Sequence, residues 1–206
     1  MKIKSVPTFQ EELSLWNNGY QYIAGVDEVG RGCFAGPVVA AAVVLPQKFT
    51  TSLPVNDSKI LSAKVRTLLA KEIQEQALSY AIAEIAVPII NNVGIAQATQ
   101  QAFRKAIKSL AKQPDYILID AFYIKQLSRK NQKPIIHGDG LSISIAAASI
   151  IAKVYRDELM KKLHLQYKQY DFAGNKGYGT KKHQEAIKQY GLCDLHRTSF
   201  NLDKFL

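Results

Sequence analysis

Apolar and polar positions alternate along the chain in runs that predict strands and helices in mixed order. Apolar runs bounded by turn residues predict five strands. Apolar positions at helical spacing predict helices between and after them. The predicted fold class is α/β, a mixed five-stranded sheet flanked by helices. The predicted strands are 22–29, 36–46, 78–87, 116–120 and 133–137, and the predicted helices are 62–76, 92–110, a long helix from 142, and 180–190.

Two of these elements indicate where the core lies. Residues 38–44 form an uninterrupted apolar run, which indicates a strand covered on both faces. The helix that begins near Ser142 is nearly all apolar in its first half and charged in its second half. This pattern predicts a helix that starts in the core and emerges at the surface. The small residues at 146–149 predict close packing of that helix against the sheet.

Acidic residues close three of the predicted strands. Asp27 and Glu28 end the first strand, Asp120 ends the fourth, and Asp139 follows the fifth between two glycines. Sites in α/β sheets gather at such C-terminal strand ends. Each acid also has a plain interpretation as a solvated strand end, a turn former or a helix cap. Adjacent side chains alternate across a strand, so Asp27 and Glu28 are expected on opposite faces unless the backbone kinks.

Four carboxylates held together repel one another unless cations neutralise them. Oxygen ligands without Cys or paired His suit Mg²⁺ or Mn²⁺. Asp27, Glu28, Asp120 and Asp139 therefore predict a two-metal phosphoryl-transfer site, in which they are both metal ligands and catalytic residues. Asp139, on a glycine-flanked loop, is the ligand most expected to move. Hydrolysis of a phosphodiester at such a site is expected to leave one product end with a 3′-OH and the other with a 5′-phosphate.

The chain resembles bacterial ribonuclease HII through seven motifs in the same order, which span nearly its whole length. Two positions depart from the pattern: His137 stands where relatives often have Lys, and Ile60 replaces a common second Lys. Neither departure affects the four acids, so both concern substrate binding rather than activity. The motifs are GVDEVGRG (25–32), DSKILS (57–62), LID (118–120), GD (138–139), SIAAASIIAKVYRD (144–157), GYGT (177–180) and HRTSF (196–200).

The resemblance implies a ribonuclease H-like fold. It also implies hydrolysis of the RNA strand of RNA·DNA hybrids, nicking 5′ of single ribonucleotides embedded in duplex DNA, and a role in removing them. Gly30, Arg31 and Gly32 would contact the minor groove, where the ribose 2′-OH distinguishes RNA from DNA. A flexible turn is the alternative interpretation, but it leaves Arg31 unexplained.

The resemblance gives three other residues a role in substrate binding. For Ser58 and Lys59 it implies phosphate contact, and a helix cap with a solvated lysine is an equal alternative. Tyr178 would stack on the deoxyribose that follows the ribonucleotide, since an aromatic ring on a flexible basic loop suits stacking.

Other polar residues of the C-terminal half have structural interpretations. Thr180 is expected to cap the following helix. Asp157 is expected to pair with Lys153 one helical turn away rather than to serve as a fifth metal ligand. His183 and His196 are too far apart in the sequence to predict a metal pair, so structural or phosphate-contact roles are favoured.

Composition agrees with a polyanionic partner. The 206 residues are 47% hydrophobic, and the formal net charge is +10. Two cysteines are too few for a disulfide scaffold, the N-terminus lacks the apolar run of a signal peptide, and no stretch reaches the roughly 18 apolar residues of a membrane span. We therefore expect a cytoplasmic, monomeric protein with no membrane contact.

The expected organisation is a ribonuclease H-like catalytic domain over 1–170 and a small helical C-terminal extension over 171–206. The extension packs on the catalytic domain and carries a substrate-binding loop. Residues 200–206 have two interpretations: a tail packed on the core, which is favoured, or a degenerate sliding-clamp peptide. The first predicted strand begins at residue 22, which leaves no room for the N-terminal substrate-binding domain of the related ribonuclease HIII.

Two other classes of protein fit less well. An integrase or junction resolvase uses a similar acidic sheet, but nothing in the chain resembles the partner modules of those enzymes. A nucleic-acid-binding protein without enzymatic activity needs no acid cluster, because carboxylates weaken binding to a phosphate backbone. Turnover that depends on a divalent metal separates an enzyme from such a binder.

Overall fold

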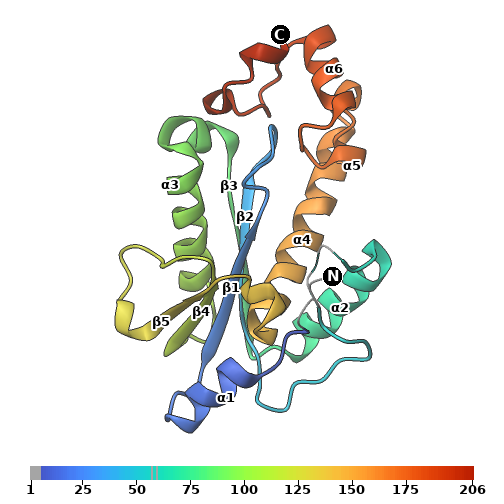
Figure 1. The fold of residues 1–206 in the computed structure, drawn as a ribbon. Helices are drawn as coiled ribbons and strands as arrows, with labels where there is room; N and C mark the ends of the chain where they lie inside the picture. Colours follow the sequence, from blue (N-terminus) through green and yellow to red (C-terminus); the bar gives the residue numbers. More distant parts are fainter. Residues whose placement is uncertain (1–5, 57, 59) are drawn as a thin grey trace.

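One five-stranded sheet lies at the centre of the computed structural model, which describes residues 6–56, 58 and 60–206 (Figure 1). The strand order is β3-β2-β1-β4-β5. β2 pairs antiparallel with both β1 and β3, whereas β4 runs parallel to β1 and to β5. The strands are β1 (Ile23–Val29), β2 (Val38–Val44), β3 (Ser79–Ile85), β4 (Tyr116–Asp120) and β5 (Gln132–Ile135).

Helices cover both faces of the sheet, which confirms the predicted fold class (Figure 1). α3 (Val87–Lys108) packs on one face, and α2 (Ala63–Gln76) and α4 (Ile143–His164) pack on the other. Every residue of β2 is buried between these two layers, as its uninterrupted apolar run predicts. The remaining α-helices of the described residues are α1 (Gln10–Asn17), α5 (Phe172–Asn175) and α6 (Lys181–Tyr190); the short 3-10 helices are η1 (Arg129–Asn131), η2 (Gly138–Gly140), η3 (Lys168–Tyr170), η4 (Thr198–Phe200) and η5 (Asp203–Phe205).

α4 lies directly against β1 because position 25 has no side chain. A β-carbon on Gly25 would lie 2.0 Å from the backbone carbon of Ser144, so any larger residue would push the helix away. The alanines at 146–148 are fully buried in the same layer. The predicted close packing of this helix on the sheet is therefore confirmed. Side-chain oxygens of Ser62, Ser142 and Thr180 cap α2, α4 and α6, which confirms the predicted cap at Thr180 and the predicted helix starts near residues 62 and 142.

Several element boundaries differ from the predicted ones. α3 begins at Val87 rather than near residue 92, because Pro88 suits a first helical turn. Gly94, with φ of 77°, kinks this helix and interrupts the helical spacing in the sequence. β5 ends at Ile135, and the chain then turns at His137, which has φ of 58°. α1 lies outside the predicted elements.

The C-terminal residues pack on the rest of the molecule. Phe172 and Tyr170 form a buried cluster with Met160 of α4. Leu202 is buried, and the ring of Phe205 lies 5.3 Å from that of Phe34. The favoured interpretation of the tail, packing on the core, is confirmed, while the clamp peptide and the domain boundary at residue 170 stay predictions. None of the helices described here is long and apolar enough to span a bilayer.

Candidate active site

Asp27 lies near the C-terminal end of β1, on the face that α4 covers. Ala24 and Val26 point into the core beneath α3, so the alternation of the strand directs Asp27 toward α4. The residue is only 4% exposed. Its carboxylate accepts a hydrogen bond from the Glu28 backbone N–H at 2.7 Å and another from the hydroxyl of Ser149 in α4.

The pKa of Asp27 is raised well above its ordinary value. Burial is the largest cause, and the negative charges of Glu28 and Asp120 add to it. The hydrogen bonds from Ser149 and from the Glu28 amide lower the pKa, but they do not cancel these effects. Asp27 therefore lies where a positive charge would be strongly stabilised.

β4 places Asp120 beside this position. The residues that precede Asp27 and Asp120 face each other across the parallel ladder between β1 and β4. An Asp120 carboxylate oxygen accepts a hydrogen bond from the Gly138 backbone N–H at 2.8 Å. Asp139 follows directly in η2 and is 6% exposed. The acids of the three predicted strand ends thus lie at one edge of the sheet.

The side chain of Glu28 points away from that of Asp27, but its negative charge still raises the pKa of Asp27. The ladder between β1 and β2 continues through Val29, so alternation directs Glu28 to the opposite side of the strand, as the sequence predicts. The four acids supply only oxygen ligands, which suit Mg²⁺ or Mn²⁺. Among the residues that the structure describes, however, no three His, Cys, Asp or Glu side chains are already grouped closely enough to hold a metal ion.

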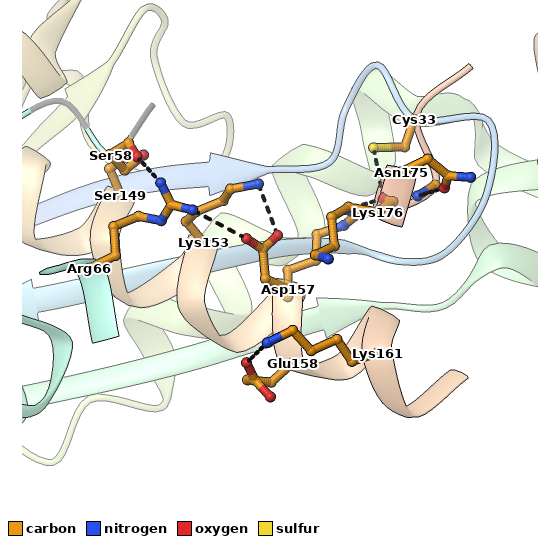
Figure 2. Close-up of polar contacts among 12 residues, drawn as sticks. Cys33, Ser58, Arg66, Ser149, Lys153, Asp157, Glu158, Lys161, Asn175 and Lys176 are labelled. Carbon is orange, nitrogen blue, oxygen red and sulfur yellow. Dashed lines mark hydrogen bonds and ion pairs between the residues drawn. The ribbon is translucent and has the colours of Figure 1, made fainter. Parts of the chain in front are cut away.

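Ser58 connects to Asp27 through Ser149. Its hydroxyl oxygen lies 3.0 Å from that of Ser149 (Figure 2). The Ser149 hydroxyl in turn bonds to the Asp27 carboxylate. Arg66 of α2 donates to the backbone carbonyl of Ser58 at 2.8 Å. Ser58 is 3% exposed, so its side chain supports the carboxylate network. Phosphate contact by Ser58 stays a prediction, and Lys59 lies outside the described residues.

Asp157 belongs to a separate ion-pair group on α4. It lies 2.9 Å from Lys153 and 3.7 Å from Arg66 (Figure 2). The predicted pairing with Lys153 is therefore confirmed. Two cations on neighbouring helices hold this carboxylate, so it is not recruited to the acid cluster.

Gly30, Arg31 and Gly32 form the turn after β1, and the two glycines differ in their surroundings. Gly30 has φ of +90°, and a β-carbon there would lie 2.2 Å from Nε of Arg156. At Gly32, nothing lies within 4 Å of such a β-carbon. Arg31 lies 3.4 Å from Glu28 and stacks over the ring of Phe122 at 4.9 Å. The fold thus requires glycine at position 30 but leaves open space at position 32.

Two fully buried arginines, Arg156 and Arg197, hold this turn from behind. Arg156 donates to the backbone carbonyls at 35, 37 and 176, at 3.1, 2.9 and 2.8 Å. Arg197 donates to the carbonyl of Arg31 at 2.9 Å and twice to that of Gly36. Burial lowers the pKa of Arg197 to about 10, which leaves it charged at neutral pH. Both arginines lie in the recognised motifs, but hydropathy patterns assign them no role.

Tyr178 lies next to the same turn. The carbonyl of Gly177 accepts hydrogen bonds from the backbone N–H groups of Phe34 and Ala35 at 2.8 and 3.2 Å. The Tyr178 residue is 41% exposed, and burial together with the neighbouring Cys33 thiol raises the pKa of its hydroxyl. The structure therefore brings this tyrosine beside the glycine-rich turn, although the two are far apart in the sequence.

His183 and His196 form a buried pair that supports the Tyr178 loop. Their Nε2 atoms lie 3.0 Å apart. Nδ1 of His183 donates to the Tyr178 carbonyl at 2.9 Å, so Nε2 of His183 is the acceptor and Nε2 of His196 the donor. Nδ1 of His196 then accepts from the Cys193 N–H at 2.9 Å, which is consistent. Burial and the neighbouring His183 lower the pKa of His196 to about 4. The structural role of the two histidines is confirmed, and their burial excludes contact with a phosphate.

The sequence matches a known family over most of its length. The family described as Ribonuclease HII matches residues 24–203. A ribonuclease HII of Ruminiclostridium cellulolyticum is 53% identical over 184 residues, which are 89% of this chain and 71% of that protein.

Solved structures share the fold. The ribonuclease H2 of Pyrococcus horikoshii superposes with a TM-score of 0.74 at 26% identity, over 90% of this chain and 97% of that one. A ribonuclease HIII called Bst, solved in complex with Mn²⁺, superposes with a TM-score of 0.71 at 22% identity, over 90% of this chain and 68% of that one. These similarities confirm the ribonuclease H-like fold. With the sequence matches, they show that the chain belongs to the ribonuclease HII family and is an endoribonuclease of the ribonuclease H type.

Proposed function

We propose that this protein hydrolyses the RNA strand of RNA·DNA hybrids and nicks duplex DNA on the 5′ side of single embedded ribonucleotides. The observation that carries the proposal is the position of Asp27, Asp120 and Asp139 at neighbouring strand ends, where the residues before Asp27 and Asp120 pair across the sheet and Asp27 and Asp139 are buried. Several carboxylates grouped near an exposed turn and a tyrosine fit phosphodiester hydrolysis better than nucleic-acid binding without catalysis.

We assign two Mg²⁺ or Mn²⁺ ions to Asp27, Glu28, Asp120 and Asp139. The donors are all oxygen, and the raised pKa of Asp27 reflects negative charge that a cation would neutralise. The ribonuclease HIII solved with Mn²⁺ supports the choice. When bound, such ions lower the pKa of the attacking water and stabilise the leaving 3′-oxygen.

The chain's own groups orient these acids. Ser149 and the Glu28 amide direct the Asp27 carboxylate, while the Gly138 N–H directs Asp120. Donors to a carboxylate favour its charged form, so they partly offset the burial and the negative charges that raise the pKa of Asp27. Ser58 reaches the same carboxylate through Ser149.

Recognition of the ribonucleotide is assigned to the turn and the tyrosine. Open space at Gly32 lets the backbone approach the minor groove, where a ribose 2′-OH both donates and accepts hydrogen bonds. Gly30 holds the turn in place, and Arg31 adds a positive charge beside Glu28. Tyr178, partly exposed beside this turn, stacks on the deoxyribose that follows the ribonucleotide. The protein would act as a monomer in the cytoplasm, in the removal of ribonucleotides from DNA.

The experiment that tests the proposal maps the ends of the products. An RNA·DNA hybrid labelled at the 5′ end of its RNA is incubated with Mn²⁺, Mg²⁺ or a chelator. We expect cleavage only with metal, and fragments whose 3′-OH ends a polymerase extends without prior phosphatase treatment. Fragments that end in a 2′,3′-cyclic phosphate would contradict the proposal, because they require attack by the ribose 2′-OH rather than by water.

A further inference from the structure

A cavity of about 560 Å³ opens between α3 and the connection from β4 to η1. None of its lining residues is acidic. A cavity of this size takes a nucleotide-sized ligand. Four cationic and two aromatic side chains contribute to its wall: Arg31, Arg104, Lys125, Arg129, Phe122 and Tyr123.

Two of these cations contact neutral groups. Arg104 donates to the backbone carbonyl of Lys125 at 3.4 Å. The guanidinium of Arg129 lies 5.0 Å from the ring centroid of Tyr123, which is 40% exposed. Neither contact neutralises the positive charge, so both guanidiniums favour a phosphate ligand.

Two buried glutamines hold the loop that forms one wall. Gln100 of α3 donates to the Tyr123 carbonyl at 3.1 Å and accepts from the Lys125 N–H at 2.7 Å. Gln132 accepts from the Ile124 N–H at 2.8 Å and donates to the Ile124 carbonyl at 3.1 Å. Side-chain amides thus replace strand pairing for an exposed loop. Such bracing pre-organises the loop, which lowers the entropy lost when a ligand binds.

The same loop contains two non-glycine residues in the left-handed region, Ala121 with φ of 67° and Gln126 with φ of 68°. Such conformations persist where surrounding contacts fix them, and they cluster at binding sites. Ala121 directly follows Asp120, and Arg31 belongs both to the glycine-rich turn and to the cavity wall. The cavity is therefore continuous with the candidate active site.

We propose that this cavity binds one nucleotide of a substrate strand that flanks the cleavage position. Its phosphate lies between Arg104 and Arg129, and its base or sugar stacks on Tyr123. The inference rests on the proposed function, since it assigns a further part of the same duplex to the protein. It assigns no chemistry to the cavity, only affinity and placement of the substrate.

Binding measured in a chelator tests the cavity without any turnover. The probe is a fluorescent DNA duplex with one internal ribonucleotide and long flanks, and the variants are Arg104→Ala, Arg129→Ala, their double variant, and Tyr123→Ala. Lys105→Ala and Lys130→Ala are the matched controls, because each removes an exposed positive charge next to a cavity residue but outside the wall. We expect the double variant to bind at least tenfold more weakly and each lost phosphate contact to reduce the salt slope by about 0.9. Tyr123→Ala should weaken binding by about tenfold.

Two further measurements, with shortened duplexes and with a free nucleotide, show whether the cavity binds the substrate strand. Truncating the duplex until it no longer reaches the cavity should abolish the difference between variant and wild type. Equal losses in the lysine controls, or a loss that persists on the shortest duplex, would overturn the proposal. So would deoxyadenosine monophosphate binding that the variants lose while their duplex affinity is unchanged, because the ligand would then be a free nucleotide. If wild type cleaves nothing with metal but the variants still lose affinity, the proposed function fails while the cavity stands.

Discussion

Arg156 occupies the space that a side chain at Gly30 would need, with its Nε 2.2 Å from the position of a β-carbon there. From this place Arg156 bonds to carbonyls on both the segment after the glycine-rich turn and the Tyr178 loop. The two loops assigned to ribonucleotide recognition are therefore held by one buried cation. The fold therefore requires glycine at position 30, whereas a side chain at position 32 would meet open space.

This difference predicts opposite results for two similar substitutions. Gly30→Ala should lower the free energy of unfolding by about 1–3 kcal/mol. The new β-carbon would clash with Arg156, and alanine would have to adopt the positive φ of this position. Gly32→Ala should unfold like wild type but raise KM for a duplex with a single ribonucleotide, because the added methyl group separates the backbone from the minor groove. Thermal unfolding and steady-state kinetics of both variants check this. Equal unfolding temperatures for the two variants would show that Arg156 does not confine position 30.

Removing a charge from the acid cluster should stabilise the metal-free protein. In Asp27→Asn, the amide avoids the burial of a charge and the repulsion from Glu28 and Asp120 that raise the pKa of this residue. We expect an unfolding temperature higher by about 3 °C or more in a chelator at pH 7. We also expect loss of nearly all metal-dependent cleavage. Asp157→Asn is the control, since breaking its pairs with Lys153 and Arg66 should not stabilise the protein.

The histidine pair predicts a loss of stability in mild acid. The folded pKa of His196 is about 4, below its ordinary 6.5, so the folded state binds fewer protons than the unfolded chain between these values. The contribution is complete above pH 6.5, falls as the pH drops toward 4, and amounts to at most about 3 kcal/mol.

Denaturant unfolding of wild type between pH 7 and pH 4 measures this contribution. His196→Gln should make the profile shallower without abolishing its slope, because buried His183, whose pKa is also lowered, still takes up a proton on unfolding. His137→Asn should leave the profile unchanged, since His137 is exposed and asparagine tolerates its positive φ. An acid slope as steep in His196→Gln as in wild type would assign the effect to other groups.

Tyr178 should contribute mainly at the junction between ribonucleotide and DNA. Tyr178→Ala should slow cleavage at a single embedded ribonucleotide by about tenfold to a hundredfold, because it removes one stacking contact. Its affinity for plain duplex DNA should change little, since backbone attraction comes from many basic side chains. Tyr178→Phe should retain most of the rate, because it keeps the ring and loses only the hydroxyl beside Cys33. An equal loss of affinity for plain duplex would contradict the assignment.

Patterns local to one strand or helix predicted much of the structure. The apolar runs predicted the five strands, the acids at their ends predicted the edge where Asp27 and Asp120 lie side by side, and Ser62, Ser142 and Thr180 predicted helix starts. The pairings across long sequence distances were not predictable in this way. Arg156 looks like one charged residue on a helical surface, and no local spacing brings His183 to His196.

The most direct test of the central claim uses a DNA duplex with one internal ribonucleotide, labelled at the 5′ end of the strand that carries it. Wild type, Asp27→Asn and Asp120→Asn are incubated with Mn²⁺, with Mg²⁺ and with a chelator. The account predicts a single nick on the 5′ side of the ribonucleotide, by wild type alone and only with metal. A nick in the chelator, a nick at another position, or wild-type rates in both variants would contradict it.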